Sequence, residues 1–424
     1  MKTGKAASFL FTTFDGGGNV TPILSAVSTL VVRGHGVRVM SDECTRHEIE
    51  AAGGRFVPWR VAPNKQQRSR ELDPPDWKVS QKDGLRLMSE YFMGGLAAAY
   101  AQDTVDELQR EPADLVVNFD MLLGVMAACE ARRQKLALLS TCISLFPLDG
   151  IPPFGSALAP ARTDAESAAL VEAAREFESI FDSGLPGLNA ARAKLDLPPL
   201  THLLAQAAAA QLWCVGSARA FDFPVRDLPA HVRYVGPLLR DPIWAADWNS
   251  PLPEGDSRPL VVAGFSTSFQ NHAGCLQRII DACAPLPVRL LLTLGGSIRR
   301  DEVIASGNTW VVESAPHGVI MRDAAVVVTH GGHGTLMTAL TLGVPVLVLP
   351  HGRDQGDNAV RVAWHGAGLA LDNKANATEI GNALQLLLNV ESYRIASRRL
   401  GAAIREEIQN SPLVSELERL AAQP

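Results

Sequence analysis

The sequence predicts an α/β protein with two domains, each built on an open parallel sheet. Short runs of β-branched residues and leucine alternate with Ala-rich amphipathic segments along most of the chain, a pattern typical of βαβ units. Residues 234–258, dense in proline, aspartate and tryptophan, divide this series into two halves. The 424 residues suffice for two well-developed cores. We therefore expect two Rossmann-like domains facing across a deep cleft, with ligands beyond the carboxyl ends of the strands.

The first half, residues 1–233, opens with a strand, a glycine-rich turn and a helix that ends at Gly34. Residues 60–85 are polar and rich in proline, so we expect a mobile loop there. Residues 150–200 mix Pro-rich turns with an Ala/Glu helix, as a segment covering a pocket would. Strands are expected at residues 8–14, 37–41, 115–119 and 136–140, and the first helix at 21–33.

The second half, residues 259–400, repeats the alternation, and residues 401–424 follow it with helical spacing and mixed charge. The strands of this half are expected at residues 260–264, 288–293, 309–312, 325–329 and 345–349.

Composition and charge exclude several classes of protein. The net charge of −6 and the pI near 6.0, without a basic stripe, argue against a nucleic-acid partner. Apolar runs are too short for a bilayer span, so no stable membrane insertion is expected. The short apolar run at the N-terminus passes into a glycine-rich turn and predicts a strand rather than a signal peptide. Six scattered cysteines without a CxxC pair indicate reduced thiols, a cytoplasmic location and no zinc site.

The turn "HGGHGT", residues 330–335, lies between a predicted strand and a predicted helix that ends at Gly343. Free N–H groups and the helix dipole favour an anion at this position, and the glycines let the backbone approach it closely. Thr335 adds a hydroxyl, and His330 and His333 add hydrogen-bond donors that carry charge if protonated. The turn suits a pyrophosphate without a metal, although both histidines could be ordinary turn residues.

The segment "GVPVLVLPHGRDQGDN" predicts the next buried strand, with Asp354 and Gln355 in the loop that follows. A carboxylate accepts hydrogen bonds and an amide both accepts and donates, so the pair suits vicinal hydroxyls. A phosphate binder beside a polyol binder describes a site for a nucleotide sugar.

These motifs together resemble the donor signature of family 1 glycosyltransferases with the GT-B fold, especially the bacterial natural-product, macrolide-type branch. The resemblance extends to "RYVGPLL" (233–239), "GFSTSF" (264–269) and "APHGVIMRDAAVVVTH" (315–330). It covers most of the chain, strongly over residues 230–370 and more loosely over 1–50 and 112–130. It also implies that the C-terminal helix, residues 401–424, packs back on the first domain.

The resemblance implies roles for individual residues of the second domain. His330 would contact the diphosphate, together with Thr267 and the turn residues Gly332, His333, Gly334 and Thr335. Asp354 and Gln355 would hold the sugar hydroxyls, and the segment around Ala315 and His317 would meet the base.

Two departures leave the nucleotide open between UDP and dTDP. Plant members of the family stack a tryptophan on uracil where Ser314 stands here, and they hold the ribose with a glutamate where Thr338 stands. Bacterial members that use dTDP-sugars often lack both residues.

The first turn, "DGGGNVTP" (15–22), also sketches an imperfect GxGxxG with Asp42 or Glu43 as the acidic partner, so an NAD enzyme is a weak rival. In family 1 enzymes this turn carries a histidine that is the general base, and Asn19 occupies its position here. An amide does not take up a proton at neutral pH.

Three sources of base assistance therefore remain open. Asp120, which ends "LVVNFD" and matches the family's orienting aspartate, could deprotonate the acceptor with Asn19 positioning it. Asp15 could act instead, or an acidic acceptor such as a phenol could need little help. We favour Asp120, against the alternative that it only caps the following helix.

The sequence thus predicts an inverting, metal-independent glycosyltransferase without a cofactor beyond its co-substrate, a UDP- or dTDP-sugar. The expected acceptor is a small hydrophobic molecule, and the expected state is a monomer or homodimer. Two interpretations stay open for several residues. His351 could contact the sugar or be a turn residue, and the acceptor pocket or the core could include Trp59, Trp77, Phe92 and Met93. A non-catalytic nucleotide-sugar binder and a GT-B epimerase are the alternative functions.

Overall fold

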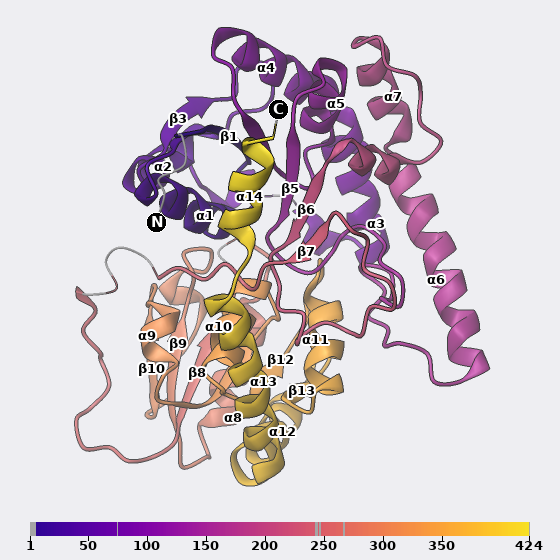
Figure 1. The fold of residues 1–424 in the computed structure, drawn as a ribbon. Coiled ribbons are helices and arrows are strands. Elements are labelled where there is room, and N and C mark those ends of the chain that lie inside the picture. The colour runs from indigo at the N-terminus through magenta and orange to yellow at the C-terminus, as the bar shows by residue number, and fades with distance from the viewer. Residues whose placement is uncertain (1–5, 74, 242–244, 246, 266–267, 424) are drawn as a thin grey trace.

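The computed structural model describes residues 6–73, 75–241, 245, 247–265 and 268–423. Two α/β domains follow each other along the chain, the first drawn in indigo to magenta above the second in orange (Figure 1). All the strand pairs that the structure describes are parallel, as the sequence predicts.

The first sheet has the strand order β3-β2-β1-β4-β5-β6-β7. Its order reverses between β1 and β4, the switch point where α/β proteins place ligands. The strands are β1 (Ser8–Thr12), β2 (Gly36–Ser41), β3 (Arg55–Pro58), β4 (Leu115–Phe119), β5 (Leu136–Ser140), β6 (Leu212–Val215) and β7 (Val232–Tyr234).

The second sheet has the order β10-β9-β8-β11-β12-β13, with the switch point between β8 and β11. The strands are β8 (Leu260–Gly264), β9 (Arg289–Thr293), β10 (Thr309–Val312), β11 (Ala324–Thr329), β12 (Val346–Val348) and β13 (Gly368–Ala370).

Helices cover both sheets (Figure 1). In the first domain they are α1 (Val20–Val32), α2 (Arg46–Ala51), α3 (Gln81–Leu87), α4 (Ala97–Arg110), α5 (Leu123–Arg132), α6 (Asp164–Asp182) and α7 (Leu185–Ala193), with a π-helical stretch at Met88–Gly95. The later helices are α8 (Ala273–Cys283), α9 (His317–Ile320), α10 (His333–Thr341), α11 (Gln355–Trp364), α12 (Ala377–Asn389), α13 (Glu391–Gln409) and α14 (Leu413–Ala421).

All nine predicted strands and the first helix are confirmed within a few residues. Four strands escaped the prediction: β3, β6, β7 and β13. Each has only three or four residues, too few for a periodic pattern to distinguish a strand from a loop.

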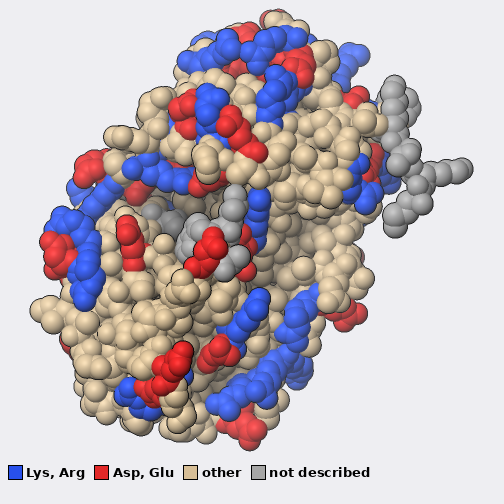
Figure 2. Space-filling view, turned by 90° about the vertical axis from the view of Figure 1, so that its left-hand side faces the viewer, with Lys and Arg blue, Asp and Glu red and all other residues tan. Residues whose placement is uncertain are grey.

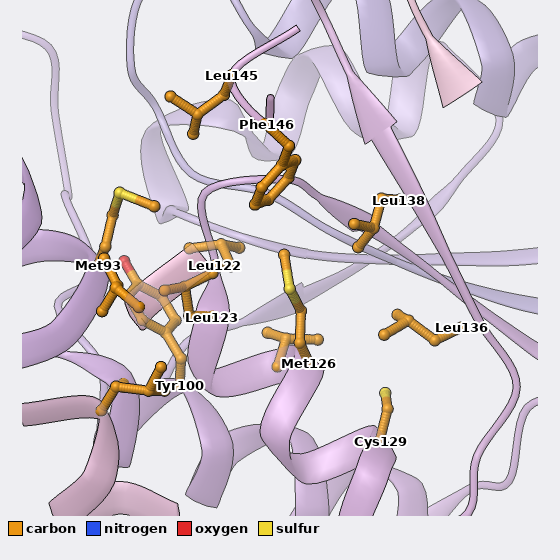
Figure 3. Packing of buried hydrophobic residues seen from close by; sticks show 14 of the residues in the cluster. Met93, Tyr100, Leu122, Leu123, Met126, Cys129, Leu136, Leu138, Leu145 and Phe146 are labelled. Carbon is orange, nitrogen blue, oxygen red and sulfur yellow. The ribbon is translucent and has the colours of Figure 1, made fainter. Parts of the chain in front are cut away.

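Apolar side chains fill both faces of the first sheet. One cluster joins Tyr100 of α4, Met126 of α5 and Leu138 of β5, and Figure 3 shows the side chains of this cluster close together. Phe9, Phe11 and Val117 face the other side and pack with α1. Residues from both ends of the chain share this second cluster, since Leu417 of α14 belongs to it.

The chain crosses back to the first domain near its end. α13 packs on α10 of the second domain, and after Asn410–Pro412 the yellow helix α14 lies against the first (Figure 1). Glu418 of α14 pairs with Arg33 at 2.7 Å and His35 at 2.8 Å. The boundary expected at residue 400 falls inside α13, because helical periodicity continues across it.

Residues 60–85 contain short helices at Arg70–Leu72 and Pro75–Lys78 and the start of α3. This segment contacts the second domain directly: Asp73 accepts a hydrogen bond from the N–H of Phe269 at 2.7 Å, and Asp76 pairs with Arg353 at 2.7 Å. It was expected to be a loop because its proline and polar content masked these turns.

No helix within the described residues has both the length and the apolar character that crossing a bilayer requires. On the face shown in Figure 2, acidic and basic side chains are mixed, with wide uncharged areas between them.

Candidate active site

The glycine-histidine turn lies where the sequence places it, between the end of β11 and the start of α10. Gly331 has φ +92°, a conformation that favours glycine. A Cβ on Gly332 would lie 2.5 Å from Nε2 of His330, so this histidine leaves no room for a side chain there. Gly334 is exposed, and no atom lies within 4 Å of the position of its missing Cβ. The N-terminus of α10 therefore offers open backbone to an anion.

His330 is a neutral group in this turn. Its ring stacks on Phe265 at 5.7 Å between centroids, and burial lowers its pKa well below the ordinary value. The positive charge that the sequence allowed for this residue is thus absent at neutral pH, although a neutral imidazole still donates one hydrogen bond.

His333 is turned toward the first domain. Its Nε2 donates to the carbonyl of Gly216 at 3.2 Å, at the end of β6, and burial lowers its pKa to about 4. The sequence grouped His333 with the phosphate contacts, but the structure uses this ring to join the two domains.

The segment that the resemblance assigns to the nucleotide lies on α9 and α10. Nδ1 of His317 lies 3.3 Å from Oγ1 of Thr335, and Gly264 leaves room for the same imidazole, because a Cβ there would lie 3.0 Å from it. Burial lowers the pKa of His317 to about 4. Ala315 lies just before α9 and is partly buried. Thr338 donates to the carbonyl of Gly334 at 2.8 Å, and Thr267 lies outside the described residues.

Asp354 and Gln355 open α11, and their side chains have different surroundings. Asp354 accepts a hydrogen bond from Nδ2 of Asn358 at 2.9 Å, and burial raises its pKa. Gln355 is fully buried: its Oε1 accepts from the N–H of His351 at 2.7 Å, and its Nε2 donates to Gln270 at 3.0 Å. Asp354 is partly exposed, whereas the side chain of Gln355 is buried and holds the loop.

Asn358 joins the two halves of the predicted donor site. Its Nδ2 donates both to Asp354 and, at 2.9 Å, to the carbonyl of Gly331 in the glycine-histidine turn. The backbone of Gln355 also lies beside this turn, since a Cβ on Gly331 would come 3.1 Å from its carbonyl oxygen. Residues 330–335 and 354–355 therefore occupy one edge of the second sheet.

Asn19 is an organiser of the first turn. Its Nδ2 donates to Oγ1 of Thr13 at 3.0 Å and to the carbonyl of Phe14 at 2.8 Å, and its Oδ1 accepts from the N–H of Gly16 at 3.0 Å. The amide is buried and both ends are used. This placement argues against a part in proton transfer, and Asn19 does not hydrogen-bond to Asp120 in the described structure.

Asp120 follows β4 at the switch point of the first sheet and is buried. Its Oδ2 accepts a hydrogen bond from Oγ of Ser140 at 2.5 Å. The same Oγ of Ser140 accepts a hydrogen bond from Nε1 of Trp213 at 2.9 Å. Burial raises the pKa of Asp120 to about 7, against the opposing effect of the Ser140 hydrogen bond. A carboxyl with this pKa is suited to exchange a proton near neutral pH.

The other acidic candidates of the first turn are already paired. Asp15 forms salt bridges with Lys65 at 3.0 Å and Arg68 at 2.9 Å, so both of its oxygens already have partners. Asp42, the acidic residue of the NAD reading, accepts N–H groups of Asp15 and Lys65.

Carboxylates of both domains act electrostatically on one thiol. Cys142 follows β5 in the first domain, and its pKa is raised by burial and then by the charges of Asp354, Asp120 and Asp357. The N–H of Gly216 donates to the carbonyl of Ser140, the partner of Asp120, at 2.9 Å, and the carbonyl of Gly216 accepts from His333 of α10 at 3.2 Å. The ends of the two sheets therefore face each other at this point. The candidate site is this interface.

The residues with two open interpretations have different surroundings in the structure. Trp59 and Met93 belong to the buried core, and Phe92 packs on Phe14 with ring centroids 4.2 Å apart. Trp77 makes an edge contact with Phe269. His351 donates from Nδ1 to the carbonyl of Leu349 at 2.8 Å and is partly buried.

One group of side chains among the described residues has spacing suited to a metal ion: Glu178, Asp182 and His202. It lies on α6 and the loop after α7, and none of its members is a predicted site residue.

Sequence reasoning missed Ser140, Trp213 and Asn358. The first two end or occupy buried strands and looked like core, and their hydrogen bonds depend on the sheet order. Asn358 could have been found, because it lies four residues after Asp354 and hence on the same helical face.

Comparisons with known proteins agree with this architecture. Residues 277–420 match the family model described as "Erythromycin biosynthesis protein CIII-like, C-terminal domain". The 4'-demethylrebeccamycin synthase of Lentzea aerocolonigenes is 27% identical over 422 residues, covering 93% of this chain and 94% of that protein. A PGL/p-HBAD biosynthesis rhamnosyltransferase of Mycobacterium bovis is 33% identical over 186 residues, 42% of this chain and 39% of that protein.

Solved structures share the whole fold. The glycotransferase of kitacinnamycin superposes with a TM-score of 0.76 at 16% identity, covering 98% of this chain and 99% of that one. CalG4, the calicheamicin glycosyltransferase, gives 0.72 at 18% identity with 98% of both chains covered. VinC in complex with dTDP gives 0.65 at 17% identity with 98% and 99% covered. The chain thus has the GT-B fold of these solved glycosyltransferases, and its residues 277–420 match the EryCIII-like C-terminal domain model.

Proposed function

We propose that this enzyme transfers a sugar from a UDP- or dTDP-sugar to a small hydrophobic acceptor, with inversion at the anomeric carbon. One observation carries the proposal: Asn358 links the open turn at α10 to Asp354, and the same turn reaches the first domain beside Asp120. His333 of the turn bonds to Gly216, whose N–H donates to Ser140, the partner of Asp120. A diphosphate at the turn would place its sugar beside Asp354 and its anomeric carbon toward the first domain. VinC, a solved glycosyltransferase with this fold, holds dTDP, which supports such a donor.

The leaving diphosphate is stabilised by the second domain in this proposal. Backbone N–H groups at the start of α10, the hydroxyl of Thr335 and a neutral His330 donate to the charge that develops as the glycosidic bond breaks. The acceptor enters from the first domain, and Asp120 takes the proton of its hydroxyl as the oxygen attacks. Attack from the face opposite the diphosphate inverts the anomeric carbon in one displacement. Alignment of the three groups at the interface lowers the barrier further.

A donor that relies on helix N–H groups needs no divalent ion. We expect transfer to continue at an unchanged rate after dialysis against EDTA, because the charge of the diphosphate is met by protein donors. Transfer is measured by product formation with and without EDTA, and then with added Mg²⁺. A loss on chelation that Mg²⁺ restores would contradict this part of the proposal.

Replacement of Gly334 by alanine tests the donor turn directly. No protein atom lies within 4 Å of the added Cβ, so the free protein should keep its melting temperature or gain slightly from better helix propensity. A donor diphosphate packed on this backbone would collide with the methyl group, and we expect its affinity to fall by roughly tenfold or more. Calorimetry with UDP and dTDP measures the effect, and unchanged binding would move the diphosphate away from Gly334.

The donor and the reaction can be assigned in one series. A thermal-shift screen of UDP- and dTDP-sugars identifies the donor, because a ligand that binds the native state raises the melting temperature. The chosen donor is then incubated alone and with hydrophobic phenols and alcohols. Transfer with inverted stereochemistry supports the proposal. A changed sugar in the donor-only sample indicates an epimerase, and tight binding without any reaction indicates a binding protein.

A further inference from the structure

One face of α11 carries two groups of residues. Its first turn carries residues of the proposed donor site, and the same face contacts the first domain. Asp357 and Asn358 lie three and four residues after Asp354, and Arg361 lies four and three residues after them, so the four side chains share this face. Asp354 and Asn358 belong to the donor site described above. Asp357 and Arg361 are buried and reach across the interface.

Asp357 holds a loop of the first domain. Its Oδ2 accepts the N–H of Gly155 at 2.6 Å, and its Oδ1 accepts the N–H of Ala157 at 2.8 Å. The loop lies between β5 and α6, in the segment that the sequence predicts to cover a pocket. Gly155 and Ala157 have φ of +78° and +51°, and the second is unfavourable for a residue with a side chain. Two charge-assisted hydrogen bonds offset this local strain.

The same loop touches α11 and the second-domain core. A Cβ on Gly356 would lie 3.1 Å from Cβ of Ala157, so the loop rests directly on the first turn of the helix. Ile143, earlier in the same connection, packs into an apolar cluster with Leu336 of α10, and Phe154 packs against that cluster.

Arg361 fixes the other end of this face. It forms a salt bridge with Asp222 of the first domain at 2.8 Å, with both side chains almost fully buried. Asp222 also accepts from the hydroxyl of Tyr234 at 2.7 Å. Asp357 and Arg361 therefore both tie the face of α11 that carries Asp354 to the first domain.

We propose that Asp357 is a positioning residue that seats loop 151–157 on the donor helix, so that the acceptor side of the site is complete only when α11 is in place. The inference rests on the proposed function, which puts the acceptor on the first domain. Loss of the carboxylate would free the loop and weaken acceptor use while leaving the diphosphate and sugar contacts intact.

Glu407 on α13 provides a matched control. Its carboxylate also accepts two consecutive N–H groups of a first-domain loop, from Arg219 at 2.6 Å and Ala220 at 2.8 Å. It therefore joins the same two domains by the same chemistry, but from a helix that carries no donor residue. If Asp357 only held the domains together, Asp357→Asn and Glu407→Gln would behave alike.

Steady-state kinetics with both variants tests the proposal. For Asp357→Asn we expect kcat/KM for the acceptor to fall roughly 10- to 100-fold, because an amide leaves one N–H facing an NH₂ group. The donor dissociation constant and the rate of donor hydrolysis without acceptor should stay close to those of the unaltered chain. Glu407→Gln should match the unaltered chain in all three. Equal acceptor effects in the two variants, or none in Asp357→Asn, would overturn the proposal.

Amide hydrogen exchange over residues 151–157 tests the proposal without enzyme turnover. We expect slow exchange at Gly155 and Ala157 in the unaltered chain and in Glu407→Gln, and at least tenfold faster exchange in Asp357→Asn. Equal exchange in all three would overturn the proposal even if transfer fails. If the unaltered chain transfers no sugar, the proposed function fails, and exchange still decides the role of Asp357. Should Asp357→Asn not fold, as judged by its melting curve, Asp357→Glu serves with the same readouts.

Discussion

Replacement of Asp120 by asparagine is expected to reduce the rate of sugar transfer by roughly 10²- to 10⁴-fold, the usual contribution of a general base. The side chain keeps its shape and can still accept the Ser140 hydrogen bond, which is 2.5 Å long in the structure. An amide cannot take the proton of an acceptor hydroxyl. The affinity for the donor should not change, because Asp120 lies in the first domain and the proposed donor contacts lie in the second. Single-turnover rates and calorimetry on the same preparation separate the two effects.

The pH dependence gives an independent readout. Since burial raises the pKa of Asp120 to about 7, the carboxylate that acts as base is formed only above that pH, and the rate should rise through it. The Ser140 hydrogen bond lowers this pKa, so Ser140→Ala should move the midpoint of the pH–rate profile upward. A purely structural role of Asp120 would leave the midpoint where it is.

As the pH rises towards the pKa of Asp120, the stability of the fold should fall while the rate of transfer rises. The folded protein keeps a proton on Asp120 between pH 3.8 and about 7, where the unfolded chain releases it, so this residue lowers the free energy of unfolding as the pH rises through that window. Above pH 7 the buried carboxylate costs up to about 4 kcal/mol at 1.36 kcal/mol per pKa unit. Asp120→Asn should therefore melt at a higher temperature than the unaltered chain at pH 8 and differ little at pH 4. An inactive variant that is also less stable at pH 8 would indicate a structural role instead.

Local patterns were enough to predict the strand, turn and helix of the proposed donor site. The strand β11, the turn and α10 are consecutive in sequence, so hydrophobic runs and glycines defined the anion-binding turn without knowledge of the rest of the chain. The position of Asp354 followed in the same way, because parallel strands place their following loops at one edge of the sheet.

The direction of individual side chains was not predictable from the sequence. His333 donates to Gly216, 117 residues away, and Gln355 donates to Gln270, 85 residues away. Asn19 illustrates the converse, since its partners Thr13, Phe14 and Gly16 are all local. A search for hydrogen bonds within its own turn could have identified Asn19 as a turn organiser before any comparison with a histidine base.

Asparagine in place of Asp354 is expected to separate recognition of the sugar from recognition of the diphosphate. The isosteric amide keeps an oxygen for Nδ2 of Asn358, which now lies 2.9 Å from the carboxylate, so the link to Gly331 should survive. A sugar hydroxyl loses its charged acceptor. We expect the affinity for the donor sugar nucleotide to fall roughly 10- to 100-fold, while UDP or dTDP alone binds as before. Calorimetry with the sugar nucleotide and with the matching UDP or dTDP measures the two affinities.

Asp281 is the control for this change. It accepts a hydrogen bond from the amide of Gln277 at 2.9 Å on the exposed side of α8, so Asp281→Asn alters the same kind of amide–carboxylate pair outside the site. Donor affinity and kcat/KM should be unchanged in this variant. Asp354 is expected to bind a hydroxyl of the transferred sugar, which UDP and dTDP lack. If Asp354→Asn weakens the binding of the sugar nucleotide and of UDP or dTDP equally, the sugar lies elsewhere. The proposed orientation of the donor, with its anomeric carbon toward Asp120, would then be wrong.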